Sequence, residues 1–164
     1  VYKRAIIKIS TNELNEEFEK AKGSEQKLNK LLHRLSNIKI FDPACGSGNF
    51  LIIAYKELRK LEIEIIKELG QISIYSSITL DNFYGIEIDD FAHEIAILSL
   101  WLAKHQMSIE FHKEFGISKP SLPIQEAGKI YKGNACSLDW GEICNNKKGK
   151  ELSLRYFKAR ICWI

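Results

Sequence analysis

The chain has 164 residues, 45% of them hydrophobic, which is the length of one domain with a sizeable buried core. Its longest apolar run, residues 95–103, is too short to cross a bilayer, so we expect no membrane contact. The net charge is +3, but residues 145–164 hold six basic residues and one acidic residue, so the rest of the chain is slightly acidic. Composition alone therefore excludes a broad basic footprint for nucleic acid.

The four cysteines do not form a recognisable metal or disulfide pattern. They lack the paired spacing of a zinc site and the density of a secreted disulfide scaffold, and they are Cys45, Cys136, Cys144 and Cys162. The N-terminus also lacks the charged, apolar and small-residue pattern of a signal peptide. We therefore expect reduced thiols, no metal site and a cytoplasmic location.

Residues 1–37 are interpreted as a helical lead-in. Residues 1–10 read as an extended or frayed segment, and a helix is expected to begin after the N-cap candidates at positions 10–12. Gly23 and Ser24 separate this helix from a second one with leucines on one face.

Strands and helices then alternate along the chain. Strands are predicted at residues 38–42, 83–88 and 130–132. The helix between the first two strands is expected to end at Gly70, and the next helix to be capped by Asp89 or Asp90. In the helix after Asp89 or Asp90, apolar residues recur at helical spacing and indicate packing against a sheet. These residues are Phe91, Ile95, Leu98 and Leu102. This alternation is typical of a parallel sheet wound by right-handed crossovers.

The first predicted strand ends in a glycine-rich turn that opens a helix. The turn consists of Asp42, Pro43, Ala44, Cys45, Gly46, Ser47, Gly48, Asn49 and Phe50. Without a Cβ, Gly46 and Gly48 let a ligand reach backbone N–H groups and the helix N-terminus. The dinucleotide-binding fingerprint is not met, because Leu51 stands where its third glycine would be.

The other two strands also end in polar residues. Glu87 and Ile88 close the second strand, and Asn134 and Ala135 follow the third. Ligands in open α/β sheets bind beyond the carboxyl ends of the strands, which places these residues with the glycine turn. Each also has a structural interpretation: Glu87 as an ordinary strand-end carboxylate, and Asn134 as an amide that closes a turn.

The string D-P-A-C-G-S-G-N-F, residues 42–50, resembles motif I of the S-adenosylmethionine-dependent adenine-amino DNA methyltransferases. Residues 83–90, 98–107 and 132–140 are similar to successive blocks of the MmeI-like restriction–modification enzymes. The resemblance implies an α/β fold, with the Rossmann-like parallel sheet and flanking helices of class I methyltransferases, truncated after its third strand. Residues 38–144 would be the S-adenosylmethionine-binding subdomain, holding motifs I to III.

The resemblance also implies a cofactor site and a reaction. Asp42 and the glycine turn would hold the amino-acid portion of S-adenosylmethionine, Glu87 both ribose hydroxyls, and Asn134 the adenine amino group. The complete parent enzyme would bind double-stranded DNA and methylate the exocyclic amine (N6) of adenine at specific sites. Such an enzyme would serve a restriction–modification or phage-defence system.

One departure from the family concerns the methyl-transfer step. The family orients the target amine with an Asn- or Asp-Pro-Pro motif and stacks the flipped base on its aromatic residue. This chain has no Pro-Pro, since its three prolines are Pro43, Pro120 and Pro123. We therefore assign no catalytic residue and expect the fragment to be inactive. Residues 145–164 are interpreted as a basic tail that results from a truncation or a shifted reading frame. The alternatives are a non-catalytic S-adenosylmethionine-binding pseudoenzyme fragment and a methyltransferase for RNA or protein amide nitrogen.

Overall fold

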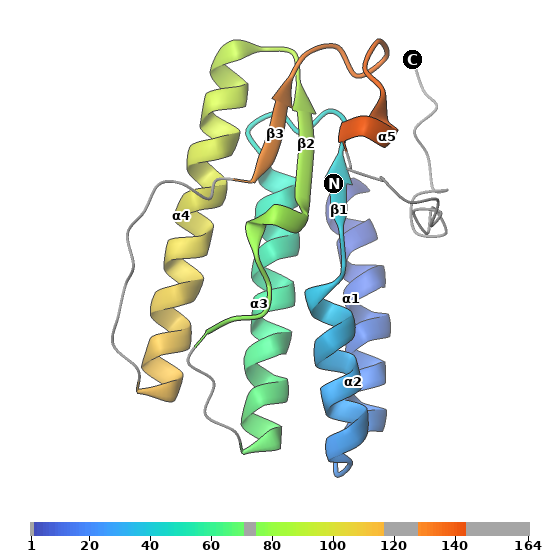
Figure 1. Ribbon diagram of the computed structural model, residues 1–164, viewed down its shortest axis with the longest axis vertical. Helices are drawn as coiled ribbons and strands as arrows, with labels where there is room; N and C mark the ends of the chain where they lie inside the picture. Colours follow the sequence, from blue (N-terminus) through green and yellow to red (C-terminus); the bar gives the residue numbers. More distant parts are fainter. Residues whose placement is uncertain (1, 71–74, 117–127, 144–164) are drawn as a thin grey trace.

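The computed structural model describes residues 2–70, 75–116 and 128–143. Figure 1 shows long helices running side by side next to a small sheet. The helices are α1 (Tyr2–Ala21), α2 (Glu25–Ser36), α3 (Asn49–Leu69), α4 (Asp90–Phe115) and the short α5 (Trp140–Ile143). The strands are β1 (Ile40–Asp42), β2 (Phe83–Glu87) and β3 (Lys129–Lys132), and a 3-10 turn, η1 (Leu80–Asn82), precedes β2. The basic tail expected at 145–164 lies outside the described residues.

The sheet is parallel, with its strands in the order β1-β2-β3. Phe41 pairs with Tyr84, and Gly85 pairs with Ile130. Helix α3 connects β1 to β2, and α4 lies between β2 and β3 in the chain. The predicted α/β class, a Rossmann-like parallel sheet with flanking helices, is confirmed, and all three predicted strands are present.

Alternate residues of β2 face opposite sides of the sheet, as the period of a strand requires. Phe83 lies in the main core with residues of α1 to α4, and its ring meets that of Tyr55 edge-on, with centroids 5.3 Å apart. Tyr84 and Ile86 lie in a second, smaller cluster with Phe41 of β1 and Ile143 of α5. Helices α3 and α4 therefore pack on one face of the sheet, with α1 and α2 packed against α3, and α5 packs on the other face (Figure 1).

The first helix differs from its prediction. Helix α1 begins at Tyr2, so the extended or frayed segment expected here is wrong for residues 2–10, and the expected N-cap residues 10–12 lie inside the helix. No glycine or proline occurs between Tyr2 and Ala21, so no backbone breaker stops the helix from extending toward the N-terminus.

Two predicted helix ends are confirmed. Gly70 ends α3 with a left-handed backbone, at φ +61°. Asp89 is the N-cap of α4, because its Oδ1 accepts a hydrogen bond of 2.7 Å from the backbone N–H of Ala92. These two ends fix the limits of the helices on either side of β2.

Helix α4 packs on α3 and the sheet through a single face of apolar side chains. Its buried residues are Ala96, Leu100, Ala103, Met107 and Phe111. The stripe recognised in the sequence lies on a different face, since Phe91 and Leu98 are 77% and 50% exposed. Within the described residues, no helix is long and apolar enough to span a membrane.

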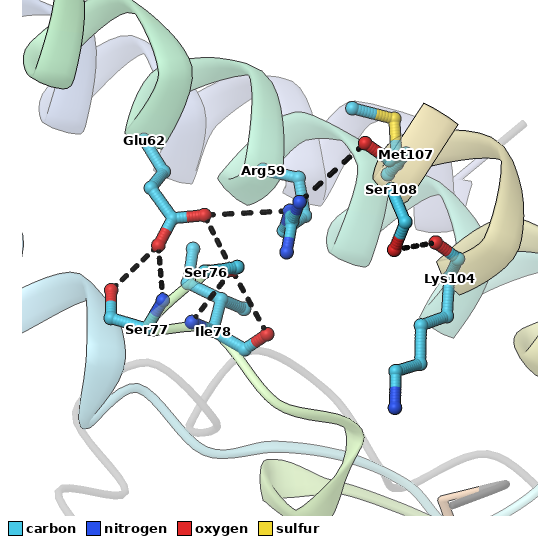
Figure 2. A network of polar contacts seen from close by, with 8 residues as sticks. All are labelled: Arg59, Glu62, Ser76, Ser77, Ile78, Lys104, Met107 and Ser108. Atoms are coloured by element: carbon cyan, nitrogen blue, oxygen red, sulfur yellow. Dashed lines mark hydrogen bonds and ion pairs between the residues drawn. The ribbon is translucent and has the colours of Figure 1, made fainter. Parts of the chain in front are cut away.

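A buried polar network joins α3, α4 and the segment before β2 (Figure 2). Glu62 is fully buried and accepts hydrogen bonds of 2.6 Å from the Ser76 hydroxyl, the Ser77 hydroxyl and the Ser77 backbone N–H. Arg59 Nε lies 3.4 Å from Glu62 Oε2, and Arg59 Nη2 donates to the Met107 carbonyl at 3.5 Å. The carboxylate thus fixes the chain that leads through η1 into β2.

Candidate cofactor site

The carboxyl ends of the three parallel strands meet at one edge of the sheet. The backbone N–H of Cys45 donates to the Ile86 carbonyl at 3.1 Å, which ties the glycine turn to the end of β2. The backbone N–H of Gly133 donates to the Glu87 carbonyl at 2.9 Å, which ties the end of β3 to the same place. The structure therefore brings all three predicted strand-end groups together.

The glycine turn begins at a buried carboxylate. Asp42 is only 4% exposed, and its Oδ1 accepts a hydrogen bond of 3.2 Å from the Ala44 backbone N–H. The Gly48 backbone N–H donates to the Cys45 carbonyl at 2.9 Å and closes the turn. Ala44 and Asn49 are exposed, whereas Pro43, Ser47 and Phe50 are half-buried. The turn thus presents both backbone and polar side chains at the edge of the sheet.

The two glycines of the turn have different roles. Gly46 has φ +56°, and a Cβ built there would meet nothing within 4 Å, so its missing side chain leaves open space. Gly48 has φ +80°, and a Cβ there would lie 3.3 Å from Cα and Cβ of Ala96 on α4. Gly46 thus offers room to a ligand, while Gly48 also lets α3 and α4 approach, a packing role that the sequence interpretation did not include.

Cys45 lies beneath the turn. It is 5% exposed, and a Cβ built at Gly85 would lie 2.9 Å from its sulfur atom and 2.9 Å from Cδ1 of Ile130. The absence of a side chain at Gly85 therefore makes the space that the Cys45 thiol fills. This glycine was placed inside the predicted strand but not identified as a part of the site.

Glu87 accepts three hydrogen bonds from the backbone. Its Oε2 accepts from Gly46 at 2.7 Å, and its Oε1 accepts from Ile88 at 2.9 Å and from Asp89 at 3.0 Å. Both oxygens are therefore occupied by N–H groups of the site itself. Ile88 next to it is 65% exposed and offers an apolar surface at the same edge.

Asn134 is exposed and closes a turn after β3. Its Oδ1 accepts a hydrogen bond of 2.9 Å from the Cys136 backbone N–H. Its carbonyl accepts from the backbone N–H and the hydroxyl of Ser137, both at 3.0 Å. The interpretation of Asn134 as a residue that closes a turn thus describes its contacts in this structure. Its side-chain NH₂ group is a hydrogen-bond donor at the tip of this turn.

The loop after β3 folds back over the second face of the sheet. Trp140 Nε1 donates to the Ala135 carbonyl at 2.7 Å, and its ring meets the ring of Phe41 edge-on, with centroids 5.4 Å apart. Trp140 holds Ala135 and Asn134 at the sheet edge without entering the site. The signal for this role was present in the sequence, because Trp140 ends one of the recognised blocks.

A further ion pair crosses the rim of the site. Lys132 Nζ at the end of β3 lies 2.5 Å from Asp90 Oδ1 in the first turn of α4. Both side chains are exposed, so the pair contributes little to stability but joins two elements that border the site. Together these residues offer a carboxylate, an apolar rim and the open space beside Gly46 to a ligand. The N–H groups of Ala44, Cys45, Gly46 and Gly48, which the sequence suggested as ligand donors, already donate within the protein.

Comparison with known proteins agrees with this geometry. The model of the MmeI DNA-methyltransferase domain family matches residues 18–159. The DNA methyltransferase A of Bacillus subtilis is 47% identical over 154 residues, covering 91% of this chain and 18% of the relative. A Methanocaldococcus jannaschii protein, named as a type II restriction enzyme and methyltransferase, is 44% identical over 151 residues, covering 85% of this chain and 13% of the relative.

A solved structure is similar as well. The Type IIL restriction–modification enzyme MmeI, in complex with DNA, matches with a TM-score of 0.77 and 38% identity over 85% of this chain and 20% of that chain. The chain thus spans about a fifth or less of the length of these relatives. The match covers the glycine turn and all three strand ends, and the chain belongs to the MmeI DNA-methyltransferase domain family.

Proposed function

We propose that this chain is the S-adenosylmethionine-binding part of an adenine-N6 DNA methyltransferase in a restriction–modification or phage-defence system. The observation that carries the proposal is the open space in front of Gly46, at the edge where Glu87 and Asn134 also lie. The Bacillus subtilis relative is named as a DNA methyltransferase and the matching family is a DNA-methyltransferase domain, which supports DNA over RNA or protein as the substrate of the complete enzyme. A cytoplasmic location belongs to the same proposal, because the enzyme must reach cellular DNA.

The residues present fit the cofactor. A side chain at Gly46 would fill the space next to the turn, and that space is what a bound amino-acid portion requires. The Glu87 carboxylate can accept from a ribose hydroxyl, and the exposed Ile88 side chain can contact an adenine ring. S-adenosylmethionine, when bound, supplies a methyl group activated by a sulfonium. The residues of this chain bind and orient it, and no residue of the chain is assigned to the target base.

Two measurements test this proposal. Calorimetry with the purified, folded chain is expected to show S-adenosylmethionine binding, and a folded chain that binds none would overturn the cofactor assignment. The full-length protein that contains this chain is expected to transfer a labelled methyl group from the cofactor to adenine N6 in unmethylated double-stranded DNA. Label recovered in cytosine, or only in RNA or protein, would contradict the substrate. The 164-residue chain alone is expected to leave DNA unlabelled.

Cys45 is expected to be structural. Cys45→Ala should lower the free energy of unfolding by about 1 kcal/mol, since a small buried side chain is lost, and should change cofactor affinity less than about threefold. Cys136→Ala is the matched control, because that thiol is free and exposed. In the native protein a maleimide should modify Cys136 and spare Cys45. Loss of cofactor binding in a folded Cys45→Ala variant would contradict this role.

A further inference from the structure

The Glu87 carboxylate links two parts of the site that are far apart in the sequence. Its Oε2 accepts the hydrogen bond from Gly46, which lies 41 positions earlier, while its Oε1 is held by the N–H groups of Ile88 and Asp89. The contacts to Ile88 and Asp89 fix the carboxylate in place. The remaining contact, at 2.7 Å, therefore holds the turn against the end of β2.

Two consecutive amides of the glycine turn are tied to β2. The Cys45 N–H donates to a backbone carbonyl, that of Ile86, so only a proline at position 45 would remove that contact by substitution. The Gly46 N–H binds a side chain, that of Glu87. Gly46 also has the left-handed backbone and the open space of the turn, at φ +56°. The Glu87 side chain therefore holds the residue whose conformation gives a ligand its room.

We propose that Glu87 is a positioning residue for the glycine turn, and that this role is separate from any contact it makes with the ribose. This inference rests on the proposed cofactor site. A carboxylate has about four acceptor positions, and backbone N–H groups fill three of them here. One ribose hydroxyl can bind without displacing a backbone donor, so most of the hydrogen-bonding capacity of Glu87 shapes the protein itself.

Glu87→Gln tests this role because an amide cannot replace the carboxylate. If the amide oxygen accepts from Ile88 and Asp89, the NH₂ group faces the Gly46 N–H, and two donors oppose each other. In the reverse orientation, the NH₂ group faces the N–H groups of Ile88 and Asp89 instead. Glu87→Asp keeps the charge but is one methylene shorter, so it cannot hold both sets of donors. Asp81→Asn is the matched control, since it removes a 67% exposed carboxylate just before β2, at its other end.

The decisive experiment measures two ligands on each variant of the 164-residue chain. The ligands are S-adenosylhomocysteine and an analogue of it that lacks both ribose hydroxyls, and affinity is measured by calorimetry. Glu87→Gln is expected to weaken both ligands by about tenfold, because the lost contact lies in the protein. Glu87→Asp should also weaken both, and Asp81→Asn should change neither by more than about twofold. Unchanged affinity of Glu87→Gln for the analogue would show that Glu87 acts only through the ribose, and would overturn the proposal.

Hydrogen exchange at the Gly46 amide gives a readout that needs no ligand. In the ligand-free chain this amide is expected to exchange at least about tenfold faster in Glu87→Gln than in the wild type, at an unchanged circular dichroism spectrum. The amide of Gly70, at the far end of α3, should exchange equally in both. Equal Gly46 exchange would overturn the proposal. A wild-type chain that binds neither ligand would instead contradict the proposed function, while the exchange rates would still decide the role of Glu87.

Discussion

Gly46→Val is expected to abolish S-adenosylmethionine binding by the folded chain, with a loss in affinity of about a hundredfold or more. Gly46 has φ +56°, a conformation that costs a residue with a Cβ about 1–2 kcal/mol and suits a β-branched residue especially badly. The added side chain would also fill the open space in front of the turn, which the cofactor is proposed to occupy. Calorimetry before and after the substitution measures the loss.

Gly70→Val separates these two effects. Gly70 has nearly the same backbone conformation, at φ +61°, and a Cβ there would likewise meet nothing within 4 Å. It ends α3, away from the strand ends. Both variants should therefore lose similar stability in urea unfolding, while only Gly46→Val should lose cofactor binding. Equal affinity of folded Gly46→Val and wild type would rule out the assignment of this turn to the cofactor.

Glu62→Ala is expected to destabilise the fold by about 3–5 kcal/mol, because it leaves a buried cation without its partner. Arg59 is 3% exposed, and its Nε lies 3.4 Å from the lost carboxylate. The hydroxyls of Ser76 and Ser77 would lose their acceptor as well (Figure 2). A loss of this size is a large share of the stability of a small domain, and urea unfolding followed by circular dichroism measures it.

Two further variants show whether the lost partner is the cause. Glu64→Gln removes an exposed carboxylate from the same helix, two positions away, and should change stability by less than about 0.5 kcal/mol. The double variant Arg59→Met with Glu62→Leu removes both charges and fills similar volume, so it should be more stable than Glu62→Ala. If the double variant is the less stable of the two, the unpaired arginine is not the source of the loss.

The elements of the sheet were predictable because their signals are local. A short run of strand residues followed by Gly46 and Gly48 indicates β1 and the helix after it. A second such run followed by Asp89 and an apolar segment indicates β2 and α4, and neither signal depends on contacts with distant residues. The start of α1 was not predictable, because residues 1–10 carry no strong apolar periodicity of their own. The face that α4 buries was also not predictable. Its sequence is apolar on several sides, and contact with α3 selected Ala96 and Ala103 over Phe91.

The order of residue types along the chain is enough to place three groups at the strand ends: the glycine turn, Glu87 and Asn134. These depend on residue type and order, and parallel strands must bring their carboxyl ends to one edge. What each group contacts depends on how the folded chain packs. In the fold, the Glu87 carboxylate accepts from the Gly46 N–H, and Gly48 lets Ala96 pack closely against the turn. The Cys45 sulfur fills the space next to Gly85. Such contacts join residues dozens of positions apart, and they depend on atomic distances that no local pattern encodes.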